Sequence, residues 1–175
     1  MDKKIRNFQI FSIVFTLTLG ALLHFTYEWS GGNKIVSLFS AVNESTWEHL
    51  KLVFYPMLIT TIIGYFYLGK DYSNFLCSKT KGILVAISFI IFFFYTYTGI
   101  IGRNFAIIDI SSFIIATILG EITSYLFIIN TTKCNNKTSK IILTILLLCF
   151  ITFTFITPKI GLFKDPVTGT YGIQK

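Results

Sequence analysis

The sequence predicts an all-α fold, a polytopic membrane helix bundle of about five transmembrane helices that forms a single domain over residues 1–175. Apolar residues make up 53% of the chain and charged residues only 13%, whereas soluble domains carry about 25% charged residues. The mean hydropathy is +0.70. A chain of 175 residues cannot bury this much apolar surface inside itself, so lipid must cover most of it.

Five apolar stretches are each long enough to cross a hydrocarbon core, which takes roughly 20 helical residues. The first of them resembles a signal peptide because it follows Lys3, Lys4 and Arg6. It lacks a small-residue cleavage site, so we expect it to be kept as a span. The expected spans are residues 8–27, 52–69, 83–101, 106–129 and 141–157.

The segments outside these spans complete the expected domain. Residues 28–51 should form an outer loop with the start of an interfacial helix. Pro56 should kink that helix, because proline removes a backbone hydrogen bond. Residues 158–175 form an outer tail with turn-forming residues at 165–169. This tail is either an ordered cap folded over the outer face or a simple interfacial tail.

The distribution of Lys and Arg predicts the orientation. Nine of them fall in the amino terminus, the 70–82 loop and the 130–140 loop, and six fall on the other side. By the positive-inside rule, the amino terminus is expected in the cytoplasm and the carboxy terminus outside, in a bacterial cytoplasmic membrane. The basic residues are scattered through short loops, so we expect no nucleic acid partner, and the expected partner is the lipid bilayer.

Cysteine usage shows neither a metal-binding motif nor a redox motif. Cys77, Cys134 and Cys149 are widely separated in the sequence. We therefore expect three free thiols.

The densest polar stretch, residues 41–51, leads into the second expected span. Ser45 followed three residues later by Glu48 predicts a capping box at a helix start. On that helix Glu44, Glu48 and Lys51 should share one face, with His49 about 100° away. This pattern indicates Glu48 or His49 as a general base. The other expected polar-site residues are Asn43, Glu44, Trp47 and Lys51.

A second polar pair, His24 and Glu28, lies at the outer end of the first expected span. The i, i+4 spacing directs both side chains the same way, which suits a shared divalent cation. If the polar stretch folds against this pair, His24, Glu28, Glu44 and His49 form a site for a divalent metal such as zinc, which activates water. Helix capping and surface ion pairs explain the same residues without a metal, and no complete signature such as H-E-x-x-H is present.

The fourth expected span contains two carboxylates, Asp109 near its outer end and Glu121 deep inside. An intramembrane carboxylate is costly, so we expect Glu121 to face the bundle interior, either in a functional site or protonated and hydrogen-bonded to a neighbouring Ser or Thr. Arg103, in the turn before this span, should reach Asp109, bind a substrate anion or contact a lipid headgroup.

Three segments carry a resemblance to a known family. They are His24 to Gly31, residues 43–51, which have the pattern N-E-S-x-W-E-H-x-K, and the tail from Phe163 to Gly172. With these segments the chain resembles an uncharacterised family of small bacterial multi-spanning membrane proteins. The resemblance implies that fold and origin, and it implies no activity, cofactor or catalytic residue.

Three classes of function fit these residues. The favoured hypothesis is an outward-facing polar His/Glu site at the outer leaflet, acting as a metal-dependent hydrolase or binding a ligand. The first alternative is a transporter or channel subunit for a small ion or metabolite, in which Glu121 continues a polar path inward. With no internal repeat, such a subunit requires further copies of the chain or a membrane partner. The second alternative is a structural accessory membrane subunit.

Overall fold

The computed structural model describes residues 3–130 and 134–173, and within these ranges the chain is helical and contains no β-strand. Each of the five long helices is apolar and long enough to cross a membrane. The predicted fold class, an all-α multi-pass membrane bundle, is therefore confirmed. The helices are α1 (Lys3–Trp29), α2 (Thr46–Leu68), α3 (Phe75–Ile101), α4 (Ala106–Asn130) and α5 (Asn136–Phe155), with two short 3-10 helices, η1 (Val36–Leu38) and η2 (Gly161–Phe163).

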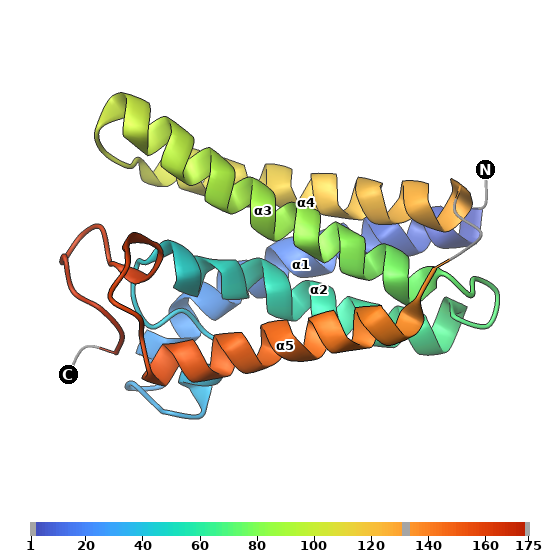
Figure 1. Ribbon diagram of the computed structural model, residues 1–175, viewed down its shortest axis with the longest axis horizontal. Coiled ribbons are helices and arrows are strands. Elements are labelled where there is room, and N and C mark those ends of the chain that lie inside the picture. The colour runs from blue at the N-terminus through green and yellow to red at the C-terminus, as the bar shows by residue number, and fades with distance from the viewer. Residues whose placement is uncertain (1–2, 131–133, 174–175) are drawn as a thin grey trace.

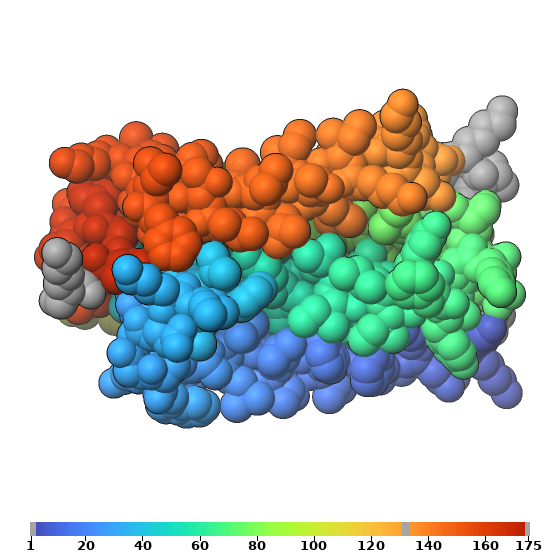
Figure 2. Space-filling model, turned by 90° about the horizontal axis from the view of Figure 1, so that it is seen from below, coloured from blue at the N-terminus to red at the C-terminus, as the bar shows by residue number. Residues whose placement is uncertain are grey.

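The helices run along the long axis of an elongated bundle (Figure 1). One end of the bundle carries the start of α1 and the α2–α3 turn, and the opposite end carries the α1–α2 connection, the α3–α4 turn and the tail. We call the second one the tail end. Toward the tail end the α3–α4 hairpin diverges from α2 and α5 (Figure 1). Figure 2 shows the tail, the end of α5 and the α1–α2 connection gathered at this end.

Helix α2 forms the centre of the bundle, because 61% of its most apolar window is buried, compared with 22 to 39% for the other four helices. Its residues Phe54 and Met57 pack in the main core with Ile83 of α3 and Phe150 of α5. A kink was expected at Pro56. Helix α2 passes through this residue and is continuous from Thr46 to Leu68.

The backbone carbonyl that Pro56 leaves without a helical donor, that of Leu52, is closely approached by α1. A Cβ atom on Gly20 of α1 would lie only 2.5 Å from this oxygen. Glycine at position 20 therefore allows α1 and α2 to pack closely at the point where the α2 hydrogen-bond ladder is interrupted.

Two helices begin earlier than the expected spans. Helix α2 begins at Thr46, six residues before the expected span, and the predicted helix start is confirmed because the Ser45 hydroxyl accepts from the backbone N–H of Glu48. Helix α3 begins at Phe75 rather than residue 83. Lys79, which the charge count assigned to a loop, is fully buried inside α3 and pairs with Glu121 at 2.6 Å. A lysine that is paired with a carboxylate can lie inside a membrane helix. Lys79 is therefore part of α3 and does not mark where this helix begins.

The expectation of three free thiols is wrong. Cys77, at the start of α3, is joined in a disulfide to Cys134, just before α5, with a Cα–Cα distance of 6.0 Å. The two are 57 residues apart in the sequence, so no short spacing motif signals the pairing. Cys149 is free.

The tail is ordered over the described residues up to 173. The Asp165 carboxylate, only 2% exposed, accepts from the backbone N–H groups of Val167 at 2.7 Å and Thr168 at 3.1 Å. It also accepts from the N–H of Glu44 at 3.3 Å. The turn-forming residues therefore fold the tail back onto the α1–α2 connection as a cap.

Candidate metal centre

The α1–α2 connection is hydrogen-bonded to the end of α1. The Ser40 hydroxyl oxygen accepts from the backbone N–H of Tyr27 at 2.9 Å and from the Thr26 hydroxyl at 3.0 Å. At the far end of the connection, the Asn43 side-chain oxygen accepts from the N–H of Ser45 at 2.9 Å. These contacts set the first turn of α2, which carries His49, beside the last turns of α1, which carry His24.

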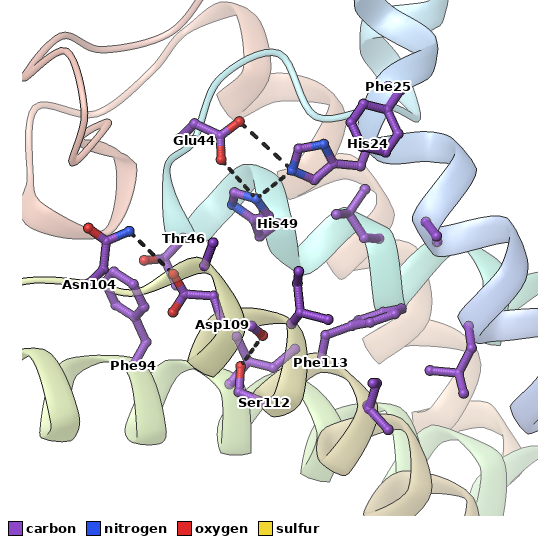
Figure 3. A pocket seen from close by; sticks show the side chains of 18 of the residues that line it. His24, Phe25, Glu44, Thr46, His49, Phe94, Asn104, Asp109, Ser112 and Phe113 are labelled. Carbon is purple, nitrogen blue, oxygen red and sulfur yellow. Dashed lines mark hydrogen bonds and ion pairs between the residues drawn. The ribbon is translucent and has the colours of Figure 1, made fainter.

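Three side chains converge at this point (Figure 3). The Nε2 atoms of His24 and His49 are 3.2 Å apart. The Glu44 carboxylate, from the connection, lies 3.8 Å from Nε2 of His24 and 3.4 Å from Nε2 of His49. One ligand atom from each side chain lies within 4.8 Å of the others. We call His24, Glu44 and His49 the His/Glu cluster.

The spacing of the His/Glu cluster suits one metal ion. Zinc binds imidazole nitrogen and carboxylate oxygen at about 2.0–2.2 Å, and tetrahedral geometry then separates neighbouring ligand atoms by about 3.4 Å. The Nε2 atoms of His24 and His49, 3.2 Å apart, and the 3.4 Å between Nε2 of His49 and one Glu44 oxygen are close to this value. The 3.8 Å contact of His24 is with the other oxygen of the same carboxylate. Two histidines and one glutamate are also a ligand set found in catalytic zinc sites, in which the fourth position stays open.

Hydrogen bonding fixes the orientation of the His49 ring. Its Nδ1 lies 3.0 Å from the carbonyl oxygen of Ser45, which can only accept, so a neutral ring carries its proton on Nδ1 and its lone pair on Nε2. That lone pair faces Nε2 of His24 and the carboxylate of Glu44, which also only accepts when ionised. A cation placed between these atoms would satisfy all of the acceptors at once, whereas a proton on Nε2 of His24 satisfies one of them.

Electrostatics reinforce this arrangement. Hydrogen bonds from His24, and then from His49 in its doubly protonated form, hold the pKa of the Glu44 carboxyl well below its ordinary range. Glu44 is therefore a carboxylate at any physiological pH, ready to ligate a cation. The His24 and His49 side chains are 31% and 29% exposed, so the cluster is accessible to a ligand.

A cavity of about 600 Å³ extends from the His/Glu cluster into the bundle, between α1, α2, α3 and α4. The cluster residues line its polar end, together with Asn104 and Asp109 (Figure 3). Most other lining side chains are apolar. They include Leu17, Ala21, Leu52, Ile90, Ile110, Phe113 and Ile114.

Two other predicted site residues of α2 form a separate buried ion pair. Glu48 and Lys51 lie 2.6 Å apart, and both are almost fully buried. Lys51 also donates to the carbonyl oxygens of Ser37 and Ser40, and Glu48 accepts from the N–H of Val42. The pair therefore holds the α1–α2 connection onto α2. Glu44 does not share their helical face, because it precedes the Ser45 cap.

Glu28, Asn43 and Trp47 also lie outside the cluster. Glu28 is exposed at the end of α1 and is not among the grouped ligands. The amide of Asn43 donates to the carbonyl oxygen of Gly172 at 2.9 Å, which fixes the tail. The Trp47 ring packs between Phe150, Phe153 and Phe163, so it joins α2 to α5 and η2.

The charged residues of the α3–α4 hairpin take different positions. Asp109 lines the cavity and accepts from the hydroxyl of Tyr97 and the amide of Asn104. Arg103 stacks over the Phe105 ring at 4.6 Å, so aromatic stacking is the contact recorded for its guanidinium group.

Glu121 faces the bundle interior away from the cavity lining. It pairs with Lys79 and accepts from the Ser12 hydroxyl at 2.7 Å. The oxygen of the Ser12 hydroxyl also lies 2.8 Å from that of the Thr60 hydroxyl. Glu121 therefore faces the bundle interior, as expected. It contacts a serine hydroxyl, as one of the two alternatives had it, and it also pairs with a buried lysine that neither alternative included.

Sequence reasoning missed two residues that support the site. Asp165 and Ser40 both fix the segment that carries Glu44, through the bonds described above. The signal for Asp165 was present, because Asp before Pro favours a turn in which the carboxylate accepts nearby N–H groups. No pattern in the sequence indicated that Ser40 meets the end of α1.

One protein family, described as a family of unknown function (DUF6512), matches residues 1–173 of the chain. No curated protein and no solved structure matches it at a significant level.

Proposed function

The chain belongs to DUF6512, a family of unknown function, and we propose that it is a metal-dependent hydrolase of the membrane surface. In this proposal His24, Glu44 and His49 bind one divalent cation, zinc. The single observation that carries it is the convergence of their three ligand atoms within 4.8 Å of one another. The open end of the cavity then leaves room for a substrate beside the metal.

The chemistry follows from the ligand set. A zinc ion held by two imidazoles and a carboxylate polarises a substrate carbonyl and lowers the pKa of water at its open position. In the chain itself, Ser45 holds the His49 tautomer, and Asp165 and Asn43 hold the segment of Glu44. This support resembles the outer shell of hydrogen bonds on which metal affinity depends in other proteins.

The proposal includes the location of the site. Among the described residues, eleven Lys and Arg side chains lie outside the two buried ion pairs. Seven of them lie at the end opposite the tail and four at the tail end. By the positive-inside rule the tail end, and with it the metal site, faces outward from a bacterial cytoplasmic membrane. The seven are Lys3, Lys4, Arg6, Lys70, Lys81, Lys137 and Lys140, and the four are Lys34, Arg103, Lys159 and Lys164. Lys133 and Lys175 lie outside the described residues.

A transport role has less support. It relied on Glu121 as the inward continuation of a cation path, but that carboxylate is paired with Lys79 in a fully buried contact. A carboxylate already neutralised by a lysine attracts a passing cation weakly.

The test is metal content. Detergent-purified protein is loaded with zinc, desalted and analysed by elemental mass spectrometry, beside a His24→Ala, His49→Ala double variant. Glu28→Gln serves as the control, since it removes a nearby carboxylate that lies outside the cluster. We expect one zinc per chain in the wild type and in the control, and none in the double variant.

Two results would contradict the proposal. One is a wild-type protein that retains no zinc. The other is a double variant that keeps the wild-type zinc content while its thermal unfolding is unchanged.

A further inference from the structure

The cavity has a strongly polarised lining, with its ionisable groups at one end. Along α1, the lining residues run from His24 at the cluster to Leu17, a depth of about 10 Å at 1.5 Å per residue. Along α4 they run from Ala106 to Ile114, about 12 Å. The cavity therefore continues from the cluster toward the middle of the bilayer as an apolar slot.

Part of the slot lining also lies on the outer surface of the membrane-spanning helices. Three of its lining residues, Phe25, Ile110 and Ile114, are 47%, 60% and 39% exposed on helices of membrane-spanning length. Phe25 lies on α1, and Ile110 and Ile114 lie on α4. Toward the tail end the α3–α4 hairpin diverges from α2 and α5 (Figure 1). A hydrocarbon chain in the bilayer would meet these apolar side chains without crossing water.

The tail lies over the water-facing side. Val167 of the tail lines the same cavity, and Asp165 ties the tail to the backbone of Glu44. A molecule approaching from water meets this ordered cap, whereas one approaching from the membrane meets exposed apolar side chains. The volume of about 600 Å³ is in the ordinary range for one small ligand or one flexible chain.

We propose that the substrate is an acylated membrane lipid whose acyl chain occupies this slot and whose acyl ester carbonyl lies at the His/Glu cluster. This inference rests on the proposed function for the reaction, while the chain site rests on the cavity alone. In the reaction, water oxygen bonds to the acyl carbon and the bond from that carbon to the ester oxygen breaks. The leaving alcohol takes one proton from water, and the fatty acid is released as a carboxylate and one proton.

The test fills the slot by substitution. Ala21→Phe on α1 and Ile110→Trp on α4 place larger side chains at lining positions. Leu22→Phe and Ile107→Trp are the matched controls, because Leu22 and Ile107 are lipid-exposed on the same helices but do not line the cavity. Zinc content, thermal unfolding and binding of the fluorescent fatty acid cis-parinaric acid are measured on the same preparations.

We expect each slot variant to weaken cis-parinaric acid binding by about tenfold or more, with zinc content unchanged, and each control to bind as the wild type. With zinc bound, p-nitrophenyl octanoate should be cleaved about tenfold faster than the butyrate ester by the wild type. This preference should be lost in Ala21→Phe and Ile110→Trp.

The outcomes separate the two proposals. Fatty acid binding that is equal in slot variants and wild type, or equally weakened in the controls, would overturn the acyl-chain site even if zinc is bound. A protein that binds the fatty acid as expected but holds no zinc would overturn the hydrolase proposal and leave the chain site standing. The His24→Ala, His49→Ala variant should lose zinc and ester cleavage and keep fatty acid binding.

Discussion

At the scale of single residues, the site depends on which carboxylate meets the two imidazoles. Glu28 follows His24 by four residues, and Glu44 precedes His49 by five. Only Glu44 is grouped with the two histidines in the structure. Glu28 lies one turn beyond His24 toward the exposed end of α1. Glu44 is brought back over His24 by the α1–α2 connection, so its contribution comes from the loop and not from helical spacing.

This difference predicts the effect of removing each charge. Glu44→Gln should lower zinc affinity by about tenfold or more, since an amide is a weak zinc ligand. Glu28→Gln should leave the affinity unchanged. Isothermal titration with zinc in detergent measures both, and an equal loss in the two variants would contradict the assignment of Glu44.

Zinc affinity should also depend on pH in a defined direction. The lowered pKa of Glu44 means that its carboxylate gains no proton between pH 8 and pH 5, so any stability it contributes is kept there and is lost only at more acidic pH. The imidazoles must be unprotonated to bind metal, and free imidazole gains a proton near pH 6.5. Zinc affinity should therefore fall steeply as the pH drops from about 7 to 5.5.

The measurement is a series of zinc titrations across this range. A flat profile down to pH 5.5 would exclude the two histidines as ligands. The same series on Glu44→Gln should show a weaker affinity with a similar slope, because the protons compete at the histidines.

At the scale of elements, the α1–α2 connection is held by a buried ion pair. Lys51 joins Glu48 to two carbonyl oxygens of the connection with no exposure to solvent. Removing one charge of a buried pair leaves the other uncompensated. The position of Glu44 therefore depends on a pair that takes no part in metal binding itself.

Lys51→Met should destabilise the protein by about 3–5 kcal/mol, the usual cost of breaking a buried pair. The control is Lys4→Met, which breaks a half-exposed pair with Asp71 and should cost less than about 1 kcal/mol. Denaturant unfolding in detergent measures both. Similar losses in the two variants would show that burial of the Glu48–Lys51 pair carries no energetic weight.

The sequence indicated the elements better than their contacts. Five spans follow from composition and length, because lipid imposes the same requirement on each. The start of α2 at the Ser45 cap was predicted, whereas the start of α3 was placed too late, since Lys79 was counted as a loop charge although it is buried in a pair with Glu121. A hydropathy scale gives a charged residue the same value whether or not it is paired. A buried ion pair near the start of a helix therefore makes the apolar span look shorter than the helix is.

The same reasoning explains the candidate site. His24, Glu44 and His49 were all predicted as ligands from their residue types and their place at one membrane boundary. The i, i+4 spacing within α1 suggested Glu28 as a fourth ligand. The path by which the 16-residue connection returns to α1 cannot be predicted from residue spacing. Trp47 and Asn43, beside the ligands in sequence, turn toward α5 and the tail because neighbours on a helix start point in different directions.

At the scale of the whole molecule, the two ends of the bundle differ in chemistry. The tail end carries the His/Glu cluster and the ordered tail, while the opposite end carries most of the exposed basic residues. The Cys77–Cys134 disulfide at that end favours an oxidising compartment, whereas the charge asymmetry favours the cytoplasm. This asymmetry predicts a single orientation in the membrane.

Reporter fusions test the orientation. Alkaline phosphatase, which is active only outside the cytoplasm, should be active when fused after the tail, and green fluorescent protein fused there should be dark. The control is the same pair of reporters fused in the α2–α3 turn, where the pattern should reverse. Fluorescence from the tail fusion would place the metal site on the cytoplasmic side and contradict the proposed location.

The contact between Asp165 and the backbone of Glu44 has a consequence for assembly. The tail follows all five helices in the chain, so the ligand loop receives its final hydrogen bonds only after the whole bundle has been inserted. Metal binding would then report complete insertion, because a chain halted before the tail has its two histidines in place but an unfixed third ligand. Under the proposed function, hydrolysis would therefore begin only after the cap is in place.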